Sequence, residues 1–105
     1  MKTSKSPRRV LQVAYEAACQ TLPAHRHKFS PQKFTQPQLL ACLVLKEFAR
    51  LDYRGLAAHF ADHPDLGAQI GLKAVPHYTT FQKAAQRLLA ATPGRRMFDA
   101  VLERA

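Results

Sequence analysis

The stretch TQPQLLACLVLKEFAR, residues 35–50, carries the strongest structural signal in this 105-residue chain. Thr35 is a favourable N-cap residue, Gln38 stands three positions later to complete a capping box, and Pro37 suits the first turn of a helix. From Leu39 to Phe48 the residues are apolar on nearly every side of a helical wheel. Such a helix is typical of the buried centre of a bundle. We therefore predict a central helix over residues 36–50.

Further helix signals lie on both sides of this stretch. Ser6 and Pro7 predict the start of a helix that continues to Leu22, and Asp52 predicts the cap of a helix that follows it. Thr79 or Thr80 is expected to open a later helix. The expected helices outside the central one cover residues 7–22, 53–61, 65–70, 79–91 and 94–104. No stretch alternates with the period of two that a strand requires. The sequence thus predicts an all-α fold, a compact bundle of about five to six helices containing a helix-turn-helix-like segment.

Three parts are expected along the chain. Residues 1–33 form a basic N-terminal helix and loop, the loop covering residues 24–33, with seven basic residues and one acidic residue in all. Residues 34–92 form a helical core that includes the helix-turn-helix-like segment at 53–91. Residues 93–105 form a C-terminal helix. No carboxylate stands between Asp65 and Asp99.

The net charge is the unusual feature of the composition. Sixteen Lys and Arg residues against seven Asp and Glu residues give +9 at pH 7. A field of this sign attracts polyanions such as DNA, RNA or an anionic membrane surface. The longest apolar run, Leu39–Leu45, is too short for a membrane span. Cys19 and Cys42 form no closely spaced pair and lie in apolar helical patterns, which indicates core thiols in a reducing compartment. We therefore expect a cytoplasmic protein with no membrane contact.

Residues 53–91 resemble a helix-turn-helix in the size and spacing of their helices. In that motif the last helix lies in the major groove and reads base edges with its N-terminal half. Lys and Arg suit guanine, Gln suits adenine, and none of them repels phosphate. The expected base-reading residues are His77, Tyr78, Thr80, Gln82, Lys83, Gln86 and Arg87. The expected phosphate contacts are Arg8, Arg9, Arg54, Arg95 and Arg96.

Several motifs, taken together, resemble a known family. They are the segments 33–41 (KFTQPQLLA), 52–56 (DYRGL), 64–66 (PDL), 70–72 (IGL) and 75–83 (VPHYTTFQK). Their order and gaps resemble the N-terminal region of bacterial insertion-sequence transposases of the DDE class, over roughly residues 8–92. The resemblance implies a helical domain that helps to bind transposon ends in DNA transposition. It also implies that an RNase H-like catalytic domain with three carboxylates follows. The chain ends at Ala105, before that domain is expected to begin, so we expect a non-catalytic fragment.

Other chemistries lack a supporting pattern. Asp62 and Asp65, like Asp99 and Glu103, have helical spacing, but their positions at helix ends are typical of capping groups. His59 and His63 stand four residues apart without a tight cysteine pair to complete a zinc site. We expect no metal, no cofactor and no catalytic residue.

Double-stranded DNA is the expected partner, together with a second copy of the chain or full-length transposase. Two alternatives remain open: a stand-alone regulator or inhibitor of transposition that uses the same surface, and an oligomerisation module built on helix 36–50.

Overall fold

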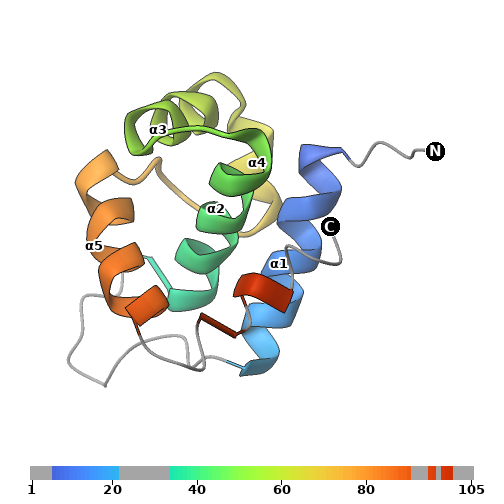
Figure 1. The fold of residues 1–105 in the computed structure, drawn as a ribbon. Helices are drawn as coiled ribbons and strands as arrows, with labels where there is room; N and C mark the ends of the chain where they lie inside the picture. The colour runs from blue at the N-terminus through green and yellow to red at the C-terminus, as the bar shows by residue number, and fades with distance from the viewer. Residues whose placement is uncertain (1–5, 22–33, 91–94, 97, 101–105) are drawn as a thin grey trace.

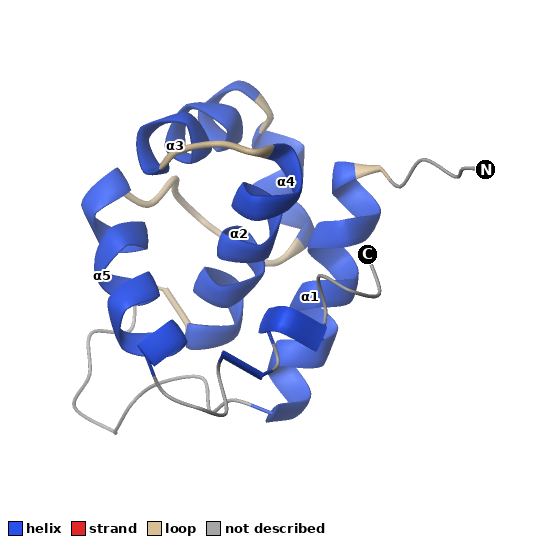
Figure 2. Ribbon diagram, viewed as in Figure 1, coloured by secondary structure: helices blue, strands red, loops and turns tan. Residues whose placement is uncertain are grey.

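A computed structural model describes residues 6–21, 34–90, 95, 96 and 98–100 of the chain. Its helices are α1 (Pro7–Thr21), α2 (Gln36–Ala49), α3 (Tyr53–Asp62), α4 (Pro64–Gln69) and α5 (Tyr78–Ala90). The described residues from 95 to 100 are also helical (Figure 1). No strand occurs in the described part of the chain (Figure 2). The predicted all-α bundle is therefore confirmed, while the expected loop at 24–33 lies outside the described residues.

The start of α2 forms as the capping box predicts. The Gln38 amide donates to the Thr35 hydroxyl at 3.2 Å, and the Gln38 side-chain oxygen accepts from the Thr35 amide at 2.9 Å. Gln38 also reaches across the fold, because its Nε2 donates to the carbonyl of Ile70 at 3.0 Å. This buried side chain therefore joins the start of α2 to the end of α4.

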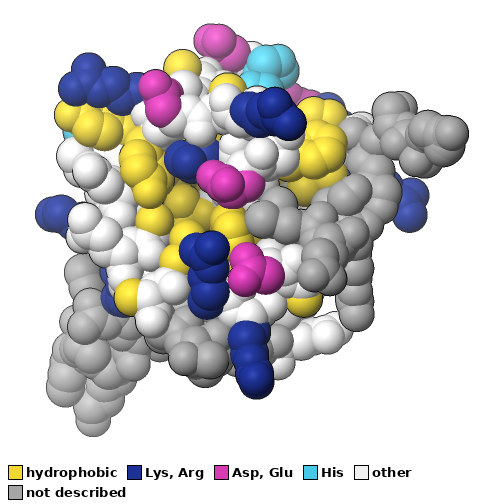
Figure 3. Space-filling view, in the orientation of Figure 1, with side chains coloured by type: hydrophobic (Ala, Val, Ile, Leu, Met, Phe, Trp, Pro, Cys, Tyr) yellow, Lys and Arg dark blue, Asp and Glu magenta, His cyan; other side chains and the backbone are white. Residues whose placement is uncertain are grey.

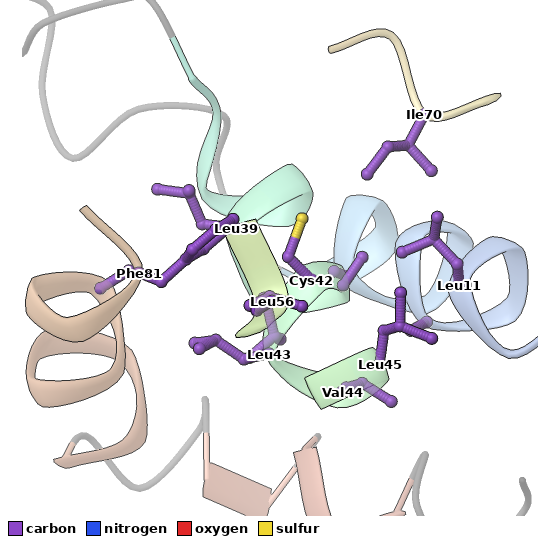
Figure 4. Packing of buried hydrophobic residues seen from close by; sticks show 14 of the residues in the cluster. Leu11, Leu39, Cys42, Leu43, Val44, Leu45, Leu56, Ile70 and Phe81 are labelled. Carbon is purple, nitrogen blue, oxygen red and sulfur yellow. The ribbon is translucent and has the colours of Figure 1, made fainter. Parts of the chain in front are cut away.

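Helix α2 is the centre of the core. Figure 4 shows the buried side chains of α2 together with those of the surrounding helices. The surrounding side chains include Leu11 of α1, Leu56 of α3, Ile70 at the end of α4, and Phe81 of α5. All residues of α2 from Gln36 to Leu45 are buried within the chain. The apolar surface of this helix is thus covered by the protein's own helices. The apolar character of residues 36–50, which suggested an oligomerisation module, is therefore explained by packing within a single chain.

The two cysteines differ in environment. Cys42 lies in α2 and is fully buried, as expected, whereas Cys19 in α1 is exposed. The prediction that Cys19 is a core residue is wrong. The buried side of α1 is set by Val10, Leu11, Ala14 and Ala18, and Cys19 points away from it.

The short helix α4 begins and ends close to the expected positions. Pro64 begins α4, and His63 is both the C-cap residue of α3 and the N-cap residue of α4. Gly71 then has a φ of 79°, a left-handed conformation that favours glycine after a helix. The observed bounds of the five helices lie within one residue of the predicted bounds at every end. The predicted last residues of two helices, at positions 22 and 91, lie outside the described residues.

No helix in the described part of the chain combines the length and the apolar character needed to cross a membrane.

Candidate nucleic-acid interface

Helix α5 is firmly seated in the core. Its buried residues are Phe81, Ala84, Ala85 and Leu88. The Phe81 ring packs on the Phe60 ring of α3, with 6.4 Å between centroids and 29° between planes. Because one side of α5 is anchored in this way, its rotation about its own axis is fixed. The opposite side therefore faces outward in a defined orientation.

The outward side of α5 carries three of the predicted base-reading residues. Gln82, Lys83 and Gln86 are exposed, whereas Thr80 and Arg87 are half-buried along the edges of this side. No carboxylate occurs anywhere from residue 66 to residue 98 of the sequence, so none stands on α5 itself. We call Gln82, Lys83 and Gln86 the α5 face. It presents amide and ammonium groups, and it carries no negative charge that would repel phosphate.

The start of α5 differs from the prediction. His77, not Thr79 or Thr80, caps the helix: the Thr79 amide donates to His77 Nδ1 at 3.2 Å, and the Thr80 amide donates to the His77 carbonyl at 2.9 Å. The Thr79 hydroxyl also lies 2.8 Å from His77 Nδ1. Because Nδ1 accepts from the backbone, the neutral ring carries its proton on Nε2. The exposed His77 thus presents an N–H donor at the first turn of α5.

Two predicted site residues from separate helices meet beside this turn. The guanidinium of Arg54 in α3 lies 4.5 Å from the centroid of the Tyr78 ring and donates to the Tyr78 hydroxyl at 3.1 Å. The Tyr78 ring in turn lies 4.5 Å from the His77 ring. Tyr78 therefore contacts both Arg54 and His77, and its ring lies beneath the Arg54 cation.

The arginines near the two ends of the chain lie elsewhere. Arg8 and Arg9 lie in the first turn of α1, at the same end of the molecule as the start of α5 but across the α3–α4 pair (Figure 1). Arg95 lines the same pocket as Ala85 and Leu89, two residues in the second half of α5. The structure therefore brings Arg54 next to α5 but gathers the other predicted phosphate contacts into no single cluster with it.

Two of these arginines already have carboxylate partners. Arg8 forms an ion pair with Asp65 of α4, and Arg95 forms an ion pair with Asp99 at 3.5 Å. Figure 3 shows the same tendency on the visible face, where Lys and Arg side chains are spread out with Asp and Glu side chains between them. The Arg8–Asp65 contact is a feature that the sequence pattern did not indicate.

Three further carboxylates have local partners. Asp52 caps α3 by accepting from the Gly55 amide, Glu47 pairs with Lys46, and Glu16 accepts from the Gln12 side chain. No group of three or more His, Cys, Asp or Glu residues within the described ranges is arranged to hold a metal ion.

Searches against protein-family models, curated proteins and solved structures found no match to this chain.

Proposed function

We propose that this chain binds double-stranded DNA, with α5 in the major groove and Arg54 on the adjacent phosphate backbone. The observation that carries the proposal is the combination at α5 of a side anchored by Phe81 and a carboxylate-free opposite side that exposes Gln82, Lys83 and Gln86. A rigid helix with exposed Lys and Gln side chains suits direct readout of guanine and adenine edges. The net charge of +9 supplies the long-range attraction that DNA binding requires.

Arg54 is the best-placed phosphate contact. It is exposed, stands in the first turn of α3 and is held by Tyr78 at the start of α5. In a helix-turn-helix protein the first helix of the motif crosses the backbone of the DNA, and α3 is the first helix of the segment 53–91. Here α3 packs directly on α5. Arg54 therefore has both the charge and the position for this role.

Transposon-end DNA is the proposed target. The motifs that resemble insertion-sequence transposases include residues 52–56 and 75–83, which contain Arg54 and Tyr78. These two motifs are distant in sequence and form one contact in the fold. That contact supports a shared role for them at the same DNA site. A stand-alone regulator of transposition would use the same surface.

The proposed activity is binding without cleavage. Two-metal phosphoryl transfer needs several carboxylates fixed around divalent ions. Asp52, Asp65 and Asp99 are engaged as a cap and as ion-pair partners in three separate places. Incubation of the purified chain with duplex DNA and Mg²⁺ or Mn²⁺ should leave both strands intact. Metal-dependent nicking that is lost in Asp65→Asn would overturn this assignment.

Salt-dependent binding tests the main proposal. Fluorescence anisotropy of a labelled duplex should show binding at low salt, with a non-specific Kd of about 10⁻⁴ to 10⁻⁶ M at physiological salt. If about six phosphates are neutralised, log K should fall with log salt at a slope of about −5. Absence of binding at low salt, or a flat salt dependence, would contradict DNA binding.

A further inference from the structure

The ion pair between Arg8 and Asp65 links two helices that lie far apart in sequence. Arg8 is in the first turn of α1 and Asp65 is in the first turn of α4. The side chains are 59% and 56% exposed, so solvent and large solutes reach both of them. The pair therefore occupies the surface and is open to competition from another anion.

A separate hydrogen bond holds Arg8 against α4. The Nε2 of Gln69 donates to the backbone carbonyl of Arg8 at 2.7 Å and to the Gln12 side chain at 3.2 Å. The backbone of Arg8 is therefore fixed next to α4 independently of the guanidinium. Arg8 also lowers the pKa of Asp65, chiefly through its hydrogen bond, so the carboxylate is ionised at neutral pH.

We propose that Asp65 is an internal competitor for DNA phosphate: it holds the Arg8 guanidinium in the protein without DNA and so weakens DNA binding. The inference rests on the proposed function. A guanidinium uses the same N–H groups for a carboxylate as for a phosphate. Arg8 therefore does not contact phosphate while it is paired with Asp65. Since an exposed ion pair is weak, releasing Arg8 should raise DNA affinity by about two- to fivefold.

The experiment compares Asp65→Asn with Asp62→Asn by anisotropy over a range of salt concentrations. Asp62 is an exposed carboxylate at the end of α3, so its replacement changes the net charge equally without touching Arg8. Asp65→Asn should bind a duplex about two- to fivefold more tightly. Its slope of log K against log salt should steepen by about 0.9, because one more phosphate is contacted. Asp62→Asn should keep the wild-type slope.

Replacing Arg8 completes the test. Arg8→Gln should abolish the gain of Asp65→Asn while having a smaller effect in the wild-type background. Asp65→Ser is the second variant, because serine is a small polar residue suited to a helix start. Circular dichroism should show wild-type helicity for whichever variant is used.

Two results would overturn the inference while leaving DNA binding intact. One is a wild-type salt slope in both folded Asp65 variants. The other is an equal gain from Asp62→Asn, which would assign the effect to net charge. If the wild-type protein and every variant fail to bind DNA at low salt, the proposed function itself falls.

Discussion

The Arg54 guanidinium lies over the Tyr78 ring and donates to the Tyr78 hydroxyl at 3.1 Å, joining the first turns of α3 and α5. A cation held over an aromatic face loses less side-chain freedom when it meets a phosphate. Tyr78 is thus expected to act through Arg54 by holding it in place, while Arg54 makes the phosphate contact.

This relationship predicts different results for two substitutions. Arg54→Ala should weaken binding to all duplexes alike and make the salt slope shallower by about 0.9, since one phosphate contact is lost. Tyr78→Phe keeps the ring and removes the hydroxyl, so it should keep the slope and cost about 0.5–1.5 kcal/mol of binding free energy. Anisotropy titrations measure both. Wild-type affinity and slope in Arg54→Ala would exclude this arginine from the interface.

Gln38 should be important for stability, because its side chain bonds to Thr35 and to the carbonyl of Ile70. Gln38→Ala leaves a buried carbonyl without its partner and should lower the free energy of unfolding by about 1–3 kcal/mol. Gln82→Ala, on the exposed α5 face, is the matched control and should change it by less than about 0.5 kcal/mol. Equilibrium urea unfolding measures both. Equal effects of the two substitutions would contradict the bond across the fold.

Asp65 should make stability sensitive to acid. Arg8 lowers the pKa of Asp65 below its unfolded value, so the stabilisation is present above the unfolded pKa and is lost as pH falls through the lower folded pKa. The unfolded value is about 3.9. Urea unfolding at neutral pH and near pH 2–3 should therefore show a stability difference between wild type and Asp65→Asn that shrinks in acid. Arg8→Gln should remove the same pH dependence. A difference that grows in acid would contradict the ion pair.

The two thiols should react at very different rates. Burial raises the pKa of Cys42, whereas Cys19 is exposed. A maleimide should modify one thiol in the native protein, and Cys19→Ser should remove that reaction. Cys42 should react only when urea unfolds the chain, since the thiolate is the reactive form and the core excludes the reagent. Rapid native labelling of Cys42 would contradict the packing of α2.

Local patterns were sufficient to predict most of the helices. Thr35 and Asp52 cap α2 and α3 as expected, because their hydrogen bonds reach only three residues along the chain. The start of α5 was misassigned because a histidine cap at His77 has a weaker sequence signature than the neighbouring Thr79 and Thr80.

Contacts between distant residues were beyond the reach of these patterns. Arg54 and Tyr78 were each predicted at the site, but 24 positions separate them, and no periodicity indicates that they touch. Arg8 was predicted as a phosphate contact, and its partner Asp65 stands 57 positions away. Tertiary packing decides such pairs. The charge pattern therefore identified the basic residues but did not show which of them already have a partner within the protein.

Comparison of α5 variants on selected and random DNA tests the central claim most directly. A duplex enriched from a random pool by binding to the wild-type protein serves as the specific site, and an unselected duplex as the reference. Lys83→Ala or Gln86→Ala should each cost about 1–3 kcal/mol on the selected duplex and less on random DNA. Arg96→Ala, which removes an exposed charge outside α5, should weaken binding to both duplexes about equally. If Lys83→Ala and Gln86→Ala reduced binding to the two duplexes by the same factor as Arg96→Ala, α5 would not be the element that reads DNA.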